Sequence, residues 1–250
     1  MRLANINEMI KLAEHLEDTP ETVIAKHLLN QGLCNAFFEG DINNPKGLIV
    51  QSQFQPEEPT AFCEDEKVFI DLMQNVKGWT CVNIDSSCPE KLGKAVEKNF
   101  GRNVWYYGDT YYVLKAEPIG FEHPDVRYLS CNDLPLLEGA PESIQGCGFK
   151  SRLHMLTDGV VAGAVINDEL KAIAHTSAIT TKYADVGVHT LELWRNKGYS
   201  SAAAAIVCRR LLDKGIIPVW STGDDNHASH KIAQKLGFMQ VSRRVYIILA

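Results

Sequence analysis

The sequence contains no long apolar run, no excess of positive charge and no closely paired cysteines, and each absence excludes a class of protein. Charged residues interrupt the apolar ones throughout the first 20 positions, which argues against a signal peptide. No run approaches the roughly 18 to 20 apolar residues of a membrane span. The formal net charge of -6 at pH 7 leaves no basic field to gather phosphate backbones. We therefore expect a cytoplasmic protein that binds neither membranes nor nucleic acid.

The cysteines are odd in number, widely spread and without a C-x-x-C pair, which excludes the usual zinc and redox motifs. We expect reduced, mostly buried thiols. His227 and His230 are three residues apart on an expected helix, but no third ligand of matching spacing follows, so no metal site is predicted. The seven cysteines are Cys34, Cys63, Cys81, Cys88, Cys131, Cys147 and Cys208.

The chain has the composition of an ordinary globular protein. Its 250 residues are 45% hydrophobic and 22% charged, which suits one large domain or two of ordinary size. The segment "EPIGFEHPD" combines two prolines and a glycine with polar residues, as linkers do. We therefore divide the chain into residues 1–120 and 121–250.

Hydrophobic periodicity predicts alternating strands and helices in both halves. Gly215 and Gly237 are expected to end helices, Pro89 to begin one, and Asn132 to cap one. In the first half we expect helices over 5–16, 20–31 and 89–101 and strands over 47–53, 79–85 and 110–116. In the second half we expect strands over 125–130, 159–168, 172–180, 183–191, 216–221 and 241–249, and helices over 132–139 and from Ser200 to 214, with a last one ending before 237.

The turn "RNKGYS", residues 195–200, joins an expected strand to an expected helix. Unpaired N–H groups and the helix dipole make a helix N-terminus a ready anion site. Gly198 lets the backbone approach a ligand, Arg195 and Lys197 add charge, and Ser200 can cap the helix or donate to a phosphate oxygen. Two interpretations stay open on these residues alone: a phosphate site, or a solvated turn with a capped helix.

Two blocks, "VGVHTLELWRNKGYSSAAA" and "DDNHASHKIAQKLGF", resemble the acyl-CoA site of the GNAT superfamily of N-acetyltransferases. Arg195, Gly198 and Ser200 match the Arg/Gln-x-x-Gly-x-Gly/Ala signature, with serine replacing the last small residue. Asn226 to Phe238 match the second motif. The amino-acid sequences of the two blocks are most similar to those of bacterial family members that have a divergent N-terminal half. The resemblance covers residues 120–250 and implies an α/β (α+β) fold, a mixed central sheet flanked by helices.

The resemblance also implies acetyl-CoA as cosubstrate and a small primary amine as acceptor. The pantetheine arm would lie between two separating strands, and the diphosphate would rest on the turn. The implied CoA-binding residues are Val188, His189, Thr190, Arg195, Asn196, Lys197, Gly198, Tyr199, Ser200, Asn226 and Ser229.

Direct attack of an amine on the thioester needs a base, an oxyanion donor and protonation of the leaving thiolate. Asp185 and Glu192 are the candidate bases, and the backbone N–H of Val188 is the candidate oxyanion donor. His175 and His189 also lie on the central strands, where a hydrogen-bonded core histidine is the commoner outcome for His175. Ala233 stands where many family members have a tyrosine acid.

The missing tyrosine leaves alternatives open. Ser229, Tyr246 or a water could protonate the thiolate, the thiol could form without a dedicated acid, or catalysis could be lost. The rival to an acetyltransferase is therefore a catalytically impaired acyl-CoA-binding module, and a weaker third interpretation is an interaction protein. The first half could be a degenerate copy of the same fold, a lid or a dimerisation unit. The sequence leaves the oligomeric state open, with a homodimer as one alternative. Aromatic residues in "NVWYYGDTYYVL" could be core or a wall of the acceptor pocket.

Overall fold

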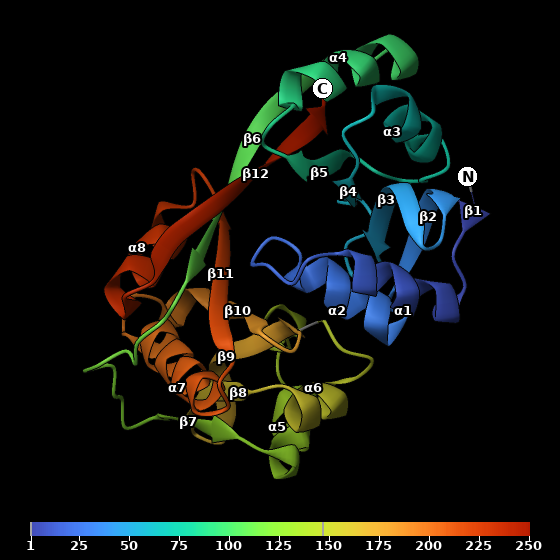
Figure 1. Cartoon of the computed structure of the whole chain (residues 1–250). Helices are drawn as coiled ribbons and strands as arrows, with labels where there is room; N and C mark the ends of the chain where they lie inside the picture. Colours follow the sequence, from blue (N-terminus) through green and yellow to red (C-terminus); the bar gives the residue numbers. More distant parts are fainter. Residues whose placement is uncertain (1, 147) are drawn as a thin grey trace.

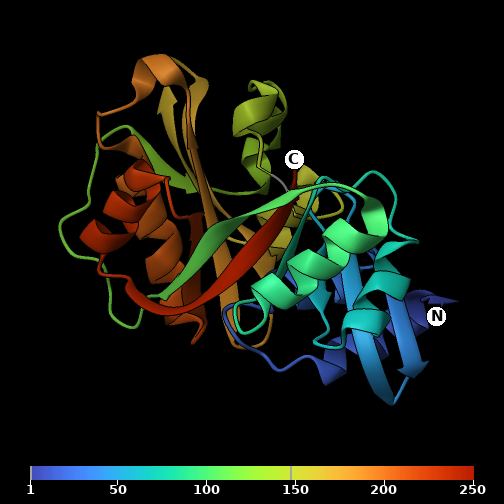
Figure 2. The same cartoon turned by 90° about the horizontal axis from the view of Figure 1, so that it is seen from above.

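The computed structural model describes residues 2–146 and 148–250, which form one mixed sheet of 12 strands with helices on its faces (Figure 1). The predicted fold class is confirmed. The two halves of the chain form two lobes, and the long strands β6 (Val104–Val113) and β12 (Met239–Leu249) run between them. Seen from above, these two strands lie side by side across the middle of the molecule (Figure 2).

The first half carries ten elements in the described residues. They are β1 (Arg2–Leu3), α1 (Ile6–His15), α2 (Val23–Gln31), β2 (Cys34–Asp41), β3 (Asn44–Ser52), β4 (Thr60–Phe62), α3 (Glu66–Met73), β5 (Cys81–Asp85), α4 (Pro89–Phe100) and β6. The second half carries β7 (Val126–Leu129), α5 (Leu134–Glu138), α6 (Arg152–Asp158), β8 (Val161–Ile166), β9 (Glu169–Ile179), β10 (Tyr183–Thr190), α7 (Tyr199–Asp213), β11 (Ile217–Gly223), α8 (His227–Leu236) and β12, with short 3₁₀ turns between some of them.

Both halves follow one order of elements: a strand, two helical segments, three strands, then helix, strand, helix and strand. No repeat is apparent in the amino acids. The sheet order is β1-β2-β3-β4-β5-β12-β6-β11-β10-β9-β8-β7. The last strand of each half is thus exchanged, because β12 pairs with β5 and β6 pairs with β11. The two halves share a continuous backbone ladder.

Local signals place most elements correctly. Pro89 is the first residue of α4, Gly237 ends α8 with a φ of 91°, and β8 and β9 form the expected hairpin. Asn132 as a helix cap is wrong, because Ser130 makes a capping box with Asp133 ahead of α5. The short strands β1 and β4, strand β2 and the helices α3 and α6 were not expected.

Helix α2 of the first half packs against the second half beside β9. The buried ring of His27 places Nε2 2.8 Å from the Gly148 carbonyl and Nδ1 3.3 Å from the Ile179 carbonyl. Asp18 accepts hydrogen bonds from the hydroxyls of Thr180 (2.8 Å) and Thr181 (3.1 Å). These polar contacts connect the two lobes in addition to the shared strands.

The six described cysteines are free thiols, and three of them are buried. Burial raises the pKa of Cys34 and of Cys208 to about 12, so neither supplies a thiolate near neutral pH. Cys131 is exposed, which the expectation of mostly buried thiols did not include, and Cys147 lies outside the described residues. Over residues 2–146 and 148–250, no helix is both long and apolar enough to cross a membrane.

Candidate functional site

The parallel strands β10 and β11 separate part of the way along their length. They pair from Tyr183 to Asp185, where Asp185 faces Val219, and beyond that point β10 pairs only with β9 and β11 only with β6. The register between β10 and β9 shifts by one residue at the same place, with Ser177 as the extra residue. In the described structure, Val186–Thr190 therefore have one edge without a partner strand, and an extended ligand can pair with the backbone there.

The free edge of β10 leads directly to the turn before α7. Asn196 and Gly198 have positive φ angles of 64° and 86°, which turn the chain sharply into the helix. Gly198 is the N-cap residue and provides no side-chain hydrogen bond, so the first amides of α7 have no capping side chain. The first helical hydrogen bond of this turn runs from the Ala202 N–H to the Gly198 carbonyl at 3.0 Å. The geometry is that of an uncapped helix N-terminus available to an anion.

The side chains of the turn divide into exposed cations and packed residues. Arg195 and Lys197 are exposed, and the Lys197 ammonium lies 4.5 Å from the centre of the Trp194 ring. Tyr199 is buried with its ring against Trp194, so it can offer a ligand only its backbone amide. The expected capping role of Ser200 is wrong, because its hydroxyl lies 2.6 Å from that of Thr190 and ties the helix to the strand.

The second motif forms the turn between β11 and α8. Asn226 caps α8 by accepting a hydrogen bond from the Ser229 N–H at 3.1 Å, and the Ser229 hydroxyl accepts from the Trp220 indole at 2.8 Å. Ala233 is fully buried against the core. Both Asn226 and Ser229 thus have structural partners, and their predicted contact with pantetheine stays a prediction.

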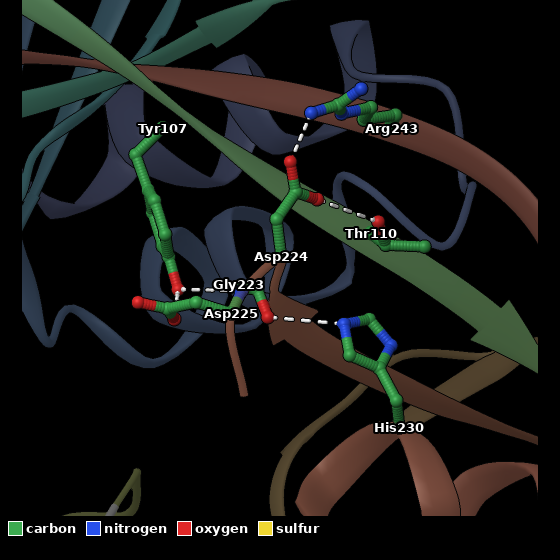
Figure 3. Close-up of polar contacts among 7 residues, drawn as sticks. All are labelled: Tyr107, Thr110, Gly223, Asp224, Asp225, His230 and Arg243. Atoms are coloured by element: carbon green, nitrogen blue, oxygen red, sulfur yellow. Dashed lines mark hydrogen bonds and ion pairs between the residues drawn. The ribbon is translucent and has the colours of Figure 1, made fainter. Parts of the chain in front are cut away.

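Strand β6 of the first half fixes this same turn (Figure 3). The Tyr107 hydroxyl donates to the carboxylate of Asp225, and Asp224 accepts from the Thr110 hydroxyl at 3.3 Å and from Arg243. Deeper in the turn, His230 of α8 places Nε2 3.1 Å from the Gly223 carbonyl. Tyr107 and Thr110 of the first half thus hold the second motif together with Arg243 and His230 of the second half.

Asp185 is a buried carboxyl at the point where the strands separate. It accepts hydrogen bonds from the hydroxyls of Ser177 and Ser221, the latter at 3.4 Å. Burial raises the pKa of Asp185 to about 6, although the two serine hydrogen bonds oppose that shift. A carboxyl poised near neutral pH beside an open strand edge has the properties of a general base.

The other sequence candidates lie in different surroundings. Glu192 is exposed in a 3₁₀ turn past the end of β10, away from Asp185. His175 is 1% exposed with its Nδ1 3.0 Å from the Thr176 carbonyl, which confirms the expected hydrogen-bonded core histidine. Val188 is half-buried on the free edge, and His189 lies beside it with its ring stacked on that of His175 at 6.1 Å. Tyr246 lies on β12, two strands away from β11.

Sequence reasoning missed a second buried carboxyl on β6. Asp109 is 7% exposed and accepts from the Asn83 amide at 3.4 Å. Burial raises the pKa of Asp109 to about 6, and the charge of Asp185 adds to the shift. The available signal was a lone aspartate inside the aromatic strand "NVWYYGDTYYVL". In the described part of the chain, no three His, Cys, Asp or Glu side chains gather as metal ligands.

Comparisons with known proteins agree with this geometry. Residues 147–246 match the family model described as GNAT acetyltransferase. A comparison with curated proteins gives no significant match. The resemblance to the GNAT superfamily is therefore confirmed over the region that contains the separating strands and the turn before α7.

Solved structures extend the likeness of fold to the whole chain. A GCN5-related N-acetyltransferase-like protein from Streptococcus suis has a TM-score of 0.71 at 18% identity, covering 98% of this chain and 99% of that one. A GNAT-family acetyltransferase from Colwellia psychrerythraea has a TM-score of 0.60 at 13% identity, covering 99% and 98%. A tandem GNAT protein from the clavulanic acid biosynthesis pathway has a TM-score of 0.57 at 11% identity, covering 97% and 92%. At these identities the likeness shows the fold alone.

Proposed function

With this fold and family match as the premise, we propose that the protein is an N-acetyltransferase that transfers an acetyl group from acetyl-CoA to a primary amine. One observation carries the proposal: the free edge of Val186–Thr190 is followed, after one 3₁₀ turn, by the uncapped N-terminus of α7, beside Arg195 and Lys197. A pantetheine arm carries two amides that can pair with the strand edge, and a diphosphate suits the helix amides and the two cations.

The CoA site of the proposal uses all the residues named from the sequence. Pantetheine pairs with the backbone of Val188, His189 and Thr190 and lies near Asn226 and Ser229. The diphosphate rests on backbone amides between Arg195 and Ser200. Because Tyr199 is buried and Ser200 is tied to Thr190, their side chains hold the turn in shape and their amides face the ligand.

The reaction is direct attack by a neutral amine. The amine nitrogen forms a bond to the thioester carbon, the carbon–sulfur bond breaks, and the nitrogen loses one proton while the CoA thiolate gains one. We assign the base to Asp185 rather than Glu192, because Asp185 is buried at the point of strand separation and Glu192 is exposed beyond the strand. The backbone N–H of Val188 is the proposed oxyanion donor.

The first half is proposed to be a degenerate copy of the same fold, divided from the second near residue 120. Its order of elements repeats that of the second half, and its last strand completes the second half's sheet. A cytoplasmic, bacterial setting and a homodimer belong to the same proposal. The free thiols of the six described cysteines agree with a reducing compartment.

A second candidate function is an acyl-CoA-binding module without turnover. Ala233 supports it, since this position is fully buried and offers no proton to the leaving thiolate. The two functions share the CoA site and differ in the release of thiol, so one experiment separates them.

The test begins with CoA binding measured by calorimetry on the wild type, on Gly198→Val and on Gly215→Val. Both glycines have positive φ angles, 86° and 73°, and open space where a Cβ would stand, but they lie at opposite ends of α7. Backbone strain of about 1 to 2 kcal/mol is expected in both variants, and only Gly198→Val should lose CoA affinity, by tenfold or more. Equal CoA affinity in all three proteins would overturn the proposed site.

Turnover is then measured as thiol release from acetyl-CoA over a panel of primary amines. An acetyltransferase releases thiol only when an acceptor is present. Asp185→Asn should abolish acceptor-dependent release and leave CoA affinity intact, whereas Glu192→Gln should change neither. Tight CoA binding without release for any amine would favour the binding module.

A further inference from the structure

One face of the central strands carries a row of buried polar side chains that the proposed CoA site does not use. Asp185 faces Val219, Ser221 faces Tyr111, and Gly223 faces Asp109 across neighbouring strands. Residues paired across a ladder share a face, as do alternate residues along a strand. Asp185 of β10, Ser221 of β11 and Asp109 of β6 therefore lie on one face, where β10 and β11 separate.

The hydrogen-bond donors of Arg244, Ser177 and Ser221 on this face already have acceptors within the protein. Arg244 donates to the Asn83 side chain, to the Ala61 carbonyl at 2.8 Å and to the Asn83 carbonyl at 3.3 Å. The Ser177 and Ser221 hydroxyls donate to Asp185. No ion pair within 4 Å involves Asp109 or Asp185 in the described residues. The remaining hydrogen-bonding capacity of the row is that of carboxylate acceptors.

An independent observation comes from His175. Its Nε2 is buried and has no hydrogen-bond partner among the described residues, while its Nδ1 lies against the Thr176 carbonyl. The ring reaches from β9 over Gly187 of β10, where a Cβ would be 3.1 Å from Nε2. Gly187 is two residues beyond Asp185, on the stretch that has lost its β11 partner. A neutral imidazole lone pair thus adds another acceptor beside the carboxylate.

Aromatic side chains continue the same face outward from Asp109. Tyr107 and Trp105 alternate with it along β6, and their rings lie edge to face at 6.3 Å. The Tyr107 ring lies against Gly223, the last residue of β11, and leaves no room for a side chain there. Trp105 is 51% exposed, which is unusual for a large aromatic on a central strand. Aromatic faces next to carboxylates favour organic cations.

We propose that this row binds the acceptor as an ammonium ion, which is attracted by the carboxylates of Asp185 and Asp109 and by the His175 lone pair on the same face. Asp185 takes one proton from the bound ammonium, and the neutral amine then attacks the thioester. The acceptor is then a primary amine that is cationic near neutral pH and carries an apolar or aromatic body over Tyr107 and Trp105. The inference rests on the proposed function. It assigns acceptor recognition to β6, a strand of the first half.

Acceptor recognition is tested with four amines on CoA-saturated protein: phenethylamine, butylamine, glycine and aniline. Phenethylamine and butylamine are cations near neutral pH, glycine also carries a carboxylate, and aniline is uncharged. Binding is measured by calorimetry and turnover by thiol release. We expect phenethylamine to bind most tightly, butylamine next, and glycine and aniline at least about tenfold more weakly. A preference for glycine or aniline, or no binding by either cation, overturns the inference.

Two pairs of variants locate the interaction. Asp109→Asn should raise the KM for phenethylamine about tenfold or more and leave the Kd for CoA unchanged. Asp85→Asn is the matched control, since Asp85 faces Arg244 from the opposite strand and is exposed. Tyr107→Ala should remove the advantage of phenethylamine over butylamine, and Tyr107→Phe should keep it.

These outcomes separate the inference from the function beneath it. If the wild type does not bind CoA, or releases no thiol with any amine, the proposed function is contradicted. Normal CoA binding and release with the same KM for phenethylamine in wild type and Asp109→Asn contradicts the inference alone. Circular dichroism and the CoA Kd report whether each variant is folded, and the Tyr107 pair keeps the test decisive if Asp109→Asn is not.

Discussion

The turns that lead into α3 and α7 occupy equivalent places in the two halves, yet their chemistry is opposite. Each follows the third of three consecutive strands. The first turn carries Glu64, Asp65 and Glu66, and Asp65 caps α3 by accepting from the Val68 N–H at 2.9 Å. The second has no capping side chain and carries two cations. A diphosphate is therefore expected at α7 and excluded from α3.

The parallel strand pairs next to these turns, β4 with β5 and β10 with β11, also differ between the two halves. β4 and β5 pair only at Thr60 and Asn83, and the buried guanidinium of Arg244 bonds to backbone carbonyls of both strands beside that pair. In the second half, the corresponding edge of β10 is free past Asp185. The same order of elements therefore yields one open site and one closed by a side chain from β12. We expect one CoA per chain.

The largest effect is expected from separating the halves. Residues 121–250 alone lose β6, which lies between β11 and β12, and residues 1–120 alone lose β12 from between β5 and β6. Each fragment then exposes two long unpaired edges, and neither should fold cooperatively. Coexpression of the fragments should restore a soluble complex that binds CoA. A cooperative urea transition for residues 121–250 alone would contradict the exchange of strands.

A substitution at Arg244 tests whether its guanidinium closes the gap between β4 and β5. Arg244→Met removes a buried cation, leaves the carbonyls of Ala61 and Asn83 without this donor, and takes away a positive charge that favours the ionised carboxyl of Asp109. We expect the free energy of unfolding to fall by about 3 to 5 kcal/mol, measured in urea. CoA stoichiometry should stay at one per chain, because the acidic turn before α3 still repels a diphosphate. A second CoA bound to this variant would show that the guanidinium alone closes the first half.

Asp109 belongs to the exchanged strand and makes stability depend on pH. Burial raises its pKa to about 6, so between about pH 4 and pH 6 the folded protein binds more protons than the unfolded chain. The stability from the protonated carboxyl is present below that range and is lost as the pH rises through 6. As the pH rises from about 4 to about 6, the free energy of unfolding of Asp109→Asn should therefore increase by about 3 kcal/mol relative to that of the wild type. Urea denaturation at several pH values measures it, and a pH-independent difference would contradict the shift.

The turn before α7 could be predicted from the sequence because its chemistry is contiguous. Arg195, Lys197 and Gly198 lie within a few residues, and the helix after them follows from the periodicity of its apolar residues. The separation of the strands at Asp185 depends on pairing, but it lies next to the same motif. Local patterns in the amino acids therefore locate the turn, and the resemblance to the GNAT superfamily adds CoA as its expected ligand.

The proposed acceptor face could not be predicted in the same way. Asp109 reaches Gly223 only because β6 is inserted beside β11, a pairing between residues more than 100 positions apart. The role of Arg244 depends on the same exchange. Ser200 shows a smaller failure: a serine at a helix start favours capping, but the preceding positive φ of Gly198 gave that place to glycine and left the hydroxyl to Thr190.

Changing the charge of either turn, before α3 or before α7, is expected to alter CoA affinity by a smaller amount. Arg195→Ala should weaken CoA binding about tenfold, or about 1.4 kcal/mol, because one exposed cation near the diphosphate is lost. The loss should shrink as salt is added. The reciprocal change, Glu66→Lys, should create no CoA site at α3, since Asp65 still caps the helix. Equal CoA affinities for wild type and Arg195→Ala at low salt would contradict this role.

The smallest effect on stability is expected from removing a helix cap. The caps of α3 and α8 compare the two halves directly. Asp65 and Asn226 each cap a helix through one hydrogen bond to a backbone N–H, at 2.9 Å and 3.1 Å. Replacing either with alanine should cost about 1 kcal/mol of stability in urea. Only Asn226→Ala should also weaken CoA binding, because only that cap lies beside the open strands. If both variants keep full CoA affinity, Asn226 is a structural cap alone, and the pantetheine arm depends on the edge of β10.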